Sequence, residues 1–458
     1  MNLLKWMERA DDLVWGPWLL VLLLFTGTYL MIRMDFLPIH NLGFAFRCIL
    51  GREKGNRTKK QKGGISSFSA LTTELAVTIG TGNILGVTTA MVLGGPGALF
   101  WMVLTSIIGM ATKLAESTLS VKYRSVNEKG ERAGGPMYTC VNALGNKMAG
   151  KLLGSCFALL AVFASFGMGN MTQSNSIADA LSLSFSLPKA KIGLFVTLCT
   201  ILVVLGGISS ISKVTRLLVP FMGVFYLLGT LAVILVHWRN VPAALAGILG
   251  AAFCPQAVSG GILGSVTVSA FQSLRWGVSR GIFSNEAGLG ASGITAAAAD
   301  TEDYVKQGYI SMTGVFLDTV VMCSIMGLAL VTSGVLGEYA PSKLPEGTEL
   351  VLAIFRSTFG KGTDAFVSIC ITLFAFATIV GWAYQGERAF EFLMGGRTRY
   401  NVWYRFVYAL TAFLGCVFPL DAVWCFSDIC NGLMAVPNLI CVLVLSGRVC
   451  REIKEYRA

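Results

Sequence analysis

The sequence has little charge and almost no histidine. Asp, Glu, Lys and Arg make up 13% of its 458 residues, whereas a soluble domain carries about 25%. Its two histidines, His40 and His237, lie far apart, and none of its 12 cysteines form a CxxC pair. The sequence also lacks an HExxH motif and paired aspartates within apolar runs. These absences argue against a metal site and against a membrane-embedded enzyme, so we expect no catalytic residues and no cofactor.

Apolar residues dominate instead. Hydrophobic residues make up 54% of the chain and the mean hydropathy is +0.67. Many apolar runs approach the roughly 20 residues that cross about 30 Å of hydrocarbon. We therefore predict an all-α polytopic membrane protein of about eleven transmembrane helices, with 243–253 and 350–359 as short interfacial helices. The predicted spans are 14–34, 66–93, 97–122, 152–182, 191–209, 215–237, 259–299 (too interrupted for one plain helix), 307–335, 361–392, 401–418 and 421–446.

The net charge of +11 falls in short loops between the apolar runs. A nucleic-acid-binding protein would gather such charge on a soluble face. We therefore expect the protein to lie in the lipid bilayer and to bind no nucleic acid. The loop RCILGREKGNRTKKQKG at 47–63 is strongly basic, and loops of the same parity, such as 123–151, are basic as well. Because Lys and Arg favour the cytoplasmic side, we predict a plasma-membrane protein with its N-terminus outside and its C-terminus in the cytoplasm.

Two glycine clusters interrupt membrane segments at corresponding places. Gly80, Gly82 and Gly86 lie in IGTGNILG, and GLGASG follows at 288–293. Each cluster falls in the first helix of a five-helix half. Because five is an odd number, the second half must cross the membrane in the opposite orientation to the first. Paired interrupted helices in inverted halves are typical of a transporter site near the bilayer midplane. The predicted regions are an N-terminal helix and basic cytoplasmic loop (1–65), a first five-helix repeat (66–237), a second, inverted repeat (238–446) and a cytoplasmic tail (447–458).

The glycine clusters do not fit a nucleotide-binding loop, which needs a preceding strand in a βαβ unit. Glycine instead lets a membrane helix open and lets a ligand touch the backbone. Freed N–H groups suit a carboxylate, and freed carbonyls suit Na⁺ or an ammonium. Thr81 and Asn83 would add a hydroxyl and an amide at the first break. The alternative interpretation is close packing of helices through small residues.

Polar residues within apolar runs add candidates for the same site. Glu74 precedes Thr81 by two turns and faces the same side of its helix; it would meet a substrate ammonium, a coupling cation or a structural Lys or Arg. Gln173 in GNMTQSN would donate to a carboxylate in a cavity or bond to a neighbouring helix. Thr378 and Trp382 share one helix face, so the hydroxyl would ligate Na⁺ or an amine while the indole walls the pocket.

Other charges in the apolar runs indicate ion pairs. Lys113 and Glu116 are spaced i,i+3 and are expected to pair with each other. Asp318 in VFLDTVVM has no other charged residue near it in the sequence, and we assign it no role from the sequence. Structural ion pairs or gates are also expected at Arg280, Glu286, Glu387 and Arg388.

Five motifs in one order resemble the alanine or glycine:cation symporter family of the amino acid–polyamine–organocation superfamily. They are GTGNILGV, GGPGALFWM, GGPMY, RGIFSNEAGLG and GWAYQGER, and the resemblance spans about residues 66–446. It implies an inverted-repeat fold like that of the bacterial leucine transporter, with an extra N-terminal helix. It also implies Na⁺-coupled uptake of a small neutral amino acid such as alanine, glycine or D-alanine.

The resemblance also implies roles for individual residues. The substrate carboxylate would lie at Thr81 and Gly82, helped by Gln173, and the stretch around Phe283 and Ser284 would form the second broken helix. Thr378 and Trp382 would close the pocket, and the cation would lie near Gly80, Asn83 and Thr378. The alternatives are a glutamine-preferring or proton-coupled member of the same family, a passive channel, and a membrane-embedded enzyme. Uptake against a gradient separates a symporter from a channel, for which pore-lining charge rings are expected.

Overall fold

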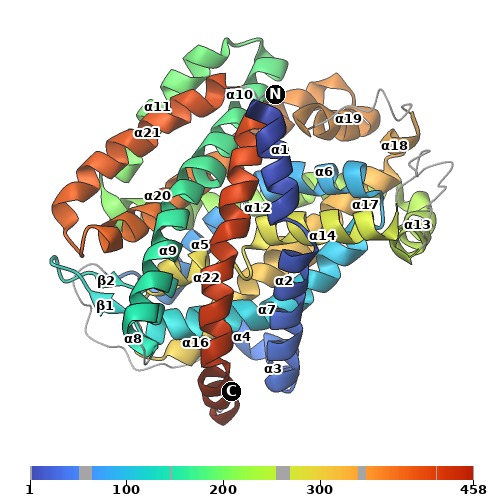
Figure 1. Cartoon of the computed structure of the whole chain (residues 1–458). Helices are drawn as coiled ribbons and strands as arrows, with labels where there is room; N and C mark the ends of the chain where they lie inside the picture. Colours follow the sequence, from blue (N-terminus) through green and yellow to red (C-terminus); the bar gives the residue numbers. More distant parts are fainter. Residues whose placement is uncertain are drawn as a thin grey trace.

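The computed structural model describes residues 3–50, 64–144, 147–253, 269–338, 347–418 and 420–456, and most of them are helical (Figure 1). The N-terminal helices are α1 (Leu3–Val14), α2 (Pro17–Arg33), α3 (Leu37–His40) and α4 (Leu42–Ile49). The next elements are α5 (Ser67–Thr78), η1 (Thr81–Asn83), α6 (Leu85–Gly94), α7 (Ala98–Lys122), β1 (Ser125–Val126), β2 (Arg132–Ala133), α8 (Pro136–Ala143), α9 (Lys147–Phe166), η2 (Gly167–Met171), α10 (Thr172–Phe185), α11 (Lys189–Val204) and α12 (Gly207–Val236).

The second half of the chain has the same helical character. Its elements are η3 (Trp238–Asn240), α13 (Val241–Phe253), α14 (Ala270–Asn285), α15 (Ala291–Ala296), α16 (Tyr304–Val315), η5 (Phe316–Cys323), α17 (Ser324–Thr332), α18 (Val335–Glu338), α19 (Gly347–Phe359), η7 (Lys361–Thr363), α20 (Asp364–Leu393), η8 (Thr398–Tyr400), α21 (Asn401–Val417) and α22 (Leu420–Glu455). The short antiparallel pair β1–β2 was not predicted.

Seven helical stretches of the described chain are long and apolar enough to cross a membrane. They are Leu4–Arg33, Ala98–Lys122, Lys147–Phe185, Gly207–Val236, Tyr304–Thr332, Lys361–Leu393 and Trp424–Glu455. The predicted interfacial segments 243–253 and 350–359 fall in α13 and α19. The described part of 259–299 is the interrupted pair α14–α15, while 254–268 lies outside the described residues. The exact count of eleven spans stays a prediction.

The outer helices present apolar side chains to their surroundings. Figure 1 shows α11 and α21 side by side at the edge of the molecule, and they pack against each other. Large apolar side chains on α11, α12 and α21 are exposed, including Leu194, Leu198, Leu202, Leu217, Phe221, Leu228, Trp403 and Leu410. In a water-soluble chain such a surface would favour aggregation; here it suits lipid. Figure 1 also places the two termini at opposite ends of the molecule.

Two membrane helices are broken at the predicted glycine clusters. The first ends at Thr78 and resumes at Leu85 after the short turn η1. The second ends at Asn285 and resumes at Ala291. In this second break Gly288 and Gly290 have φ of +96° and +78°, a region that side chains rarely adopt, so glycine is required there.

The first half of one broken helix, α5, and the second half of the other, α15, are joined at one end. Ile65, just before α5, donates to the carbonyl of Ala298 at 3.2 Å, and its own carbonyl accepts from the N–H of Asp300 at 2.7 Å. Arg124 and Arg132, which flank the β1–β2 loop, donate to the carbonyl of Ala299 at 2.9 and 2.6 Å. These bonds satisfy backbone groups of the segment that directly follows α15.

Two π-helical segments interrupt other spans. η2 joins α9 to α10 around Gly169, and η5 joins α16 to α17 around Asp318. A π-helical turn widens the hydrogen-bond ladder and is frequent at functional sites. Of these two segments, η5 contacts the broken helices at η1 and α14, whereas η2 packs on α20.

Candidate functional site

The first break contacts α10 through Thr81 and Gln173. The Gln173 side-chain oxygen accepts from the Thr81 hydroxyl at 2.9 Å and from its backbone N–H at 3.4 Å. The Gln173 amide also donates to the carbonyl of Met168 at 3.1 Å, which fixes the side chain against η2. Both Thr81 and Gln173 are buried. Two of the predicted carboxylate-binding residues therefore lie together, with their polar groups satisfied by each other in this conformation.

Thr378 on α20 reaches the same break from another side. Its hydroxyl donates to the carbonyl of Ala76 at 2.9 Å. A β-carbon at Gly80 would lie 2.4 Å from that hydroxyl oxygen, so only glycine fits there. One turn further along α20, Trp382 is fully buried, and its β-carbon would lie 2.4 Å from a β-carbon at Gly169. Thr378 thus lies against Gly80 at the first break, and Trp382 lies against Gly169 of η2.

The two breaks meet at Asp318 on η5. The amide of Asn83, from the first break, donates to an Asp318 carboxylate oxygen at 2.7 Å. The hydroxyl of Ser284, from the second, donates to the other oxygen at 2.9 Å, and Thr319 adds a bond of 2.7 Å. A β-carbon at Gly82 would lie 3.1 Å from the Cα of Ser284. A buried carboxylate, surrounded by hydroxyl and amide groups, therefore lies between both broken helices.

The role of Asp318 was missed by sequence reasoning. An acid within an apolar run is by itself a signal of function, but its partners lie far away in the chain, at Asn83 and Ser284. Nothing in the spacing of these three residues indicates that they meet.

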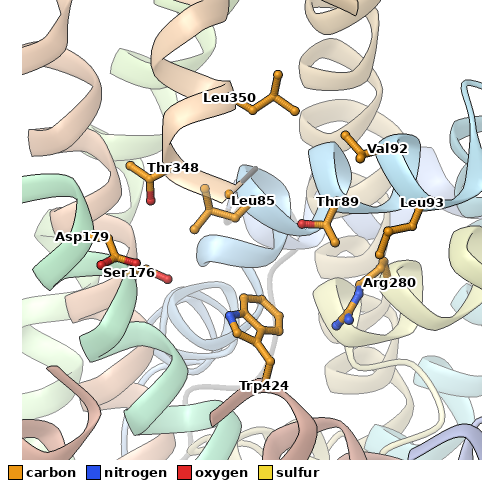
Figure 2. Close-up of a pocket in the computed structure, with 11 residues that line it drawn as sticks. Leu85, Thr89, Val92, Leu93, Ser176, Asp179, Arg280, Thr348, Leu350 and Trp424 are labelled. Atoms are coloured by element: carbon orange, nitrogen blue, oxygen red, sulfur yellow. The ribbon is translucent and has the colours of Figure 1, made fainter. Parts of the chain in front are cut away.

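A cavity of about 220 Å³ opens beside this region, as Figure 2 shows. Five helices of the described chain line the cavity. The lining residues are Leu85, Thr89, Val92 and Leu93 of α6, Ser176 and Asp179 of α10, Arg280 of α14, Thr348 and Leu350 of α19, and Trp424 of α22. Figure 1 places α19 near the N-terminal end of the molecule. This volume would hold several waters or one small zwitterion.

Arg280 closes one side of the cavity. Its guanidinium makes two hydrogen bonds to the Asp428 carboxylate, at 3.0 and 2.8 Å. It also lies 5.5 Å from the ring centre of Phe283 and 5.1 Å from that of Trp424, within cation–π range. The rings of Phe283 and Trp424 stack at 5.3 Å. Phe283 therefore belongs to this closure, next to Ser284 in the second break.

Glu74 lies in a different set of contacts from the one predicted for substrate binding. It is buried, and one carboxylate oxygen accepts from the hydroxyl of Ser311 on α16 at 2.9 Å. Lys113 and Glu116 were expected to pair with each other, and this expectation was wrong: within the described chain no ion pair joins them. Lys113 instead donates to the carbonyl of Asn285 at 3.0 Å, because the carbonyl end of α14 attracts a cation.

Glu387 and Arg388 form ion pairs, as predicted, with partners that the sequence did not reveal. Glu286, for which an ion pair was also expected, has none within the described chain and accepts from the hydroxyl of Ser292 at 3.2 Å. Arg388 bonds to Glu131 at 2.6 Å and to Glu391 at 3.0 Å. Glu387 bonds to Arg405 at 2.6 Å. The guanidinium of Arg388 holds the pKa of the Glu131 carboxyl, which is half-buried in the loop, below its usual range against the opposing effect of burial. This network ties the loop after α7 to α20 and α21.

Comparison with known proteins identifies the chain's relatives. Its sequence matches the sodium:alanine symporter family over residues 1–458. It is 44% identical over 456 residues to the sodium/alanine symporter AgcS of Methanococcus maripaludis, covering 100% of this chain and 98% of that protein. The chain belongs to the sodium:alanine symporter family. It is also 35% identical to the probable sodium/glutamine symporter GlnT of Bacillus subtilis, over 98% of this chain and 89% of that one.

Solved structures share the fold of this family member. The structure of MhsT in complex with L-phenylalanine matches with a TM-score of 0.60 at 15% identity, covering 85% of this chain and 90% of that one. The nucleobase-cation-symport transporter MHP1 matches with a TM-score of 0.51 at 12% identity, covering 88% and 95%. Membership of the family confirms the predicted resemblance and a multi-pass membrane transporter. The structural likeness confirms the predicted all-α transporter fold.

Proposed function

We propose that this protein is a secondary active symporter that moves a small neutral amino acid, alanine or glycine, inward with Na⁺ by alternating access. The observation that carries the proposal is the meeting of both broken helices around buried Asp318. Asn83 contributes from the first helix and Ser284 from the second. A ligand held there contacts both halves of the molecule at once, so its binding is linked to their relative movement.

The substrate carboxylate would lie at Thr81 and Gly82. Opening of a helix frees backbone N–H groups, which favour an anion, and the Thr81 hydroxyl stands beside them, bonded at present to Gln173 at 2.9 Å. Gln173 would then turn its amide to the bound carboxylate. Trp382, packed against Gly169, would leave room for a small side chain only. D-Alanine would fit the same volume.

The cation would be held by oxygens near the first break. The Thr378 hydroxyl lies beside Gly80, where a β-carbon would come within 2.4 Å of it, and Asn83 presents its side-chain oxygen to the Gly80 N–H at 3.1 Å. Asp318, bonded to Asn83, supplies the negative charge that a monovalent cation needs in a region of low dielectric constant. Substrate and cation would thus be ligated by neighbouring stretches of one opened helix, which is a basis for coupling.

Access would alternate between two closures. The pair Arg280–Asp428, with the Phe283 ring within cation–π range of Arg280, would close the site toward the cavity on the N-terminal, predicted outer side. The bonds of Arg124 and Arg132 to the end of α15 would close it toward the other side.

The test is uptake by purified protein in liposomes. Labelled alanine, glycine and glutamine are offered with an inward gradient of Na⁺, Li⁺ or protons. Accumulation of alanine or glycine against its gradient, driven by Na⁺ alone, is the expected result. Glutamine accumulation or drive by protons would instead support the corresponding alternatives within the family. Downhill flux without accumulation would indicate a channel, and no uptake at all would overturn the proposal.

Single substitutions test the site itself. Thr81→Val removes a hydroxyl, and Trp382→Ala removes a wall of the pocket; both are expected to abolish uptake while the protein still inserts in the membrane. Thr411→Val, which removes a partly buried hydroxyl that bonds Asn170, is the matched control and keeps most of the activity. Normal uptake by Thr81→Val or Trp382→Ala would remove that residue from the site.

A further inference from the structure

Four ionisable side chains lie buried beside the second break, and the proposed transport site does not use them. Lys113 and Glu116 come from α7, Glu74 from α5 and Glu286 from the break itself. Each has at most 2% of its surface exposed. We call these four residues the α7 cluster.

The α7 cluster holds the break together. The Lys113 ammonium donates to the carbonyl of Asn285, the last residue of α14, at 3.0 Å, and to the hydroxyl of Ser292 in the first turn of α15. Ser292 in turn donates to Glu286 at 3.2 Å. One side chain of α7 thus bridges both halves of the broken helix, and its positive charge meets the carbonyl end of α14.

Asn438 on α22 connects the cluster to the middle of the break. Its amide donates to the carbonyl of Gly288 at 2.9 Å and also to Glu116. Backbone groups freed within a membrane helix need such partners, because no water is there to replace them. The cluster and the shape of the break therefore depend on each other.

The charges of the α7 cluster do not balance if all four groups are ionised. Three carboxylates face one ammonium, and Lys113 acts electrostatically on all three. The surrounding elements add no free cation within the described chain: η5 contributes Asp318, a further acid, and Arg280 of α14 is paired with Asp428 of α22. The other neighbours are neutral.

Those neutral neighbours leave one oxygen of each glutamate without a partner. Ser311 of α16, Ser292 of α15 and Asn438 of α22 each bond to only one oxygen of their glutamate. In the described residues Glu74 Oε2, Glu116 Oε2 and Glu286 Oε1 are buried without a well-formed hydrogen bond, and the N–H of Gly288 lies near the Glu116 carboxylate. An ionised carboxylate with an oxygen that lacks a hydrogen bond raises the free energy of the folded protein in a medium of low dielectric constant.

We propose that the α7 cluster is a proton-binding site, in which two protons are shared among Glu74, Glu116 and Glu286 at neutral pH. Two protons balance the charge of Lys113, whereas Na⁺ would need several oxygens around one point. The unpartnered oxygens belong instead to three separate elements, with an ammonium among them. A proton needs only one oxygen.

This site also adjoins the proposed transport site. Glu286 follows Ser284 and Asn285 directly in the chain, and the indole N–H of Trp382 lies close to its carboxylate without a well-formed hydrogen bond. Movement of α15 away from Lys113 would change which glutamates carry the protons. This consequence, unlike the proton occupancy itself, rests on the proposed transport function.

Infrared spectroscopy of the purified protein tests the proposal without any transport assay. A protonated carboxyl gives a C=O stretching band that shifts in D₂O and with ¹³C-labelled glutamate. We expect wild-type protein at pH 7 to show a glutamic-acid band equal to two groups, and the double variant Glu74→Gln/Glu286→Gln to lose at least half of it. Glu455→Gln, at an exposed site, should leave the band unchanged. Absence of a glutamic-acid band from folded wild-type protein would overturn the proposal.

Lys113→Gln gives a second, independent test. Removing the ammonium leaves three carboxylates without a counter-charge, so the band should grow by about half, to three groups. A purely structural role for Lys113 predicts no such gain, and an unchanged band in the folded variant would count against proton sharing. Wild-type protein that shows the band but fails in every uptake assay would refute the proposed transport function and leave the proton site standing.

Discussion

Replacing Asp318 with asparagine removes one negative charge from the contact between the broken helices and leaves the size of the side chain almost unchanged. The carboxylate receives bonds of 2.7 Å from Asn83, 2.9 Å from Ser284 and 2.7 Å from Thr319. A cation ligated at the first break beside Asn83 would lie roughly 4–8 Å from it. At an effective dielectric constant of about 20, the attraction is about 2–4 kcal/mol.

This energy predicts a large loss of Na⁺ affinity. Since about 1.4 kcal/mol corresponds to a factor of ten, the Na⁺ concentration that half-saturates alanine uptake should rise roughly 30- to 1,000-fold in Asp318→Asn. Proteoliposome uptake measured over a Na⁺ titration gives this value. Asp179→Asn, at the cavity wall and paired with Lys189, is the matched control and should change it less than about threefold. An Asp318→Asn protein with wild-type Na⁺ dependence would show that Asp318 does not face the cation.

Two further substitutions test the packing of the site. Gly80→Ala should abolish uptake without preventing membrane insertion, because the new β-carbon would lie 2.4 Å from the Thr378 hydroxyl oxygen. Gly86→Ala has open space around its β-carbon and should transport normally. Equal activity of the two variants would refute the close approach of Gly80 and Thr378. Arg280→Gln should lower thermal stability by about 3–5 kcal/mol, the cost of leaving the Asp428 charge buried alone. Adding Asp428→Asn should restore most of this loss in a thermal unfolding assay, and no restoration would mean that Arg280 acts through its ring contacts instead.

The broken helices could be predicted because their signal is local. Gly80 and Gly288 stand within apolar runs, where glycine weakens a helix, and the structure opens the chain at both places. The meeting of Thr81 with Gln173 was also accessible, since an amide in an apolar helix must find a polar partner. These inferences need only the residue types and the solvent in which they lie.

The rest of the site depends on which distant helices pack together. Asn83, Ser284 and Asp318 form one cluster only because η1, α14 and η5 converge, and no spacing along the chain encodes this. Lys113 illustrates the same limit. Its i,i+3 neighbour was the expected partner, but the carbonyl end of α14, more than 170 residues later, lies at hydrogen-bond distance. The i,i+3 spacing rule considers residues of a single helix, so it cannot weigh Glu116 against the carbonyl of Asn285 as the partner of Lys113.

The backbone bridge at Ile65 has a mechanical consequence. Hydrogen bonds to Ala298 and Asp300 join the start of α5 to the segment that follows α15, while Gly82, after α5, closely approaches Ser284 of α14. The joint at Ile65 would make α5 and α15 move together, so a load applied to one would be carried by the other. In the proposed symport cycle, slippage, in which one solute crosses without its companion, would require α5 and α15 to separate. The tightness of coupling would then depend on this joint as well as on the affinity of either ligand.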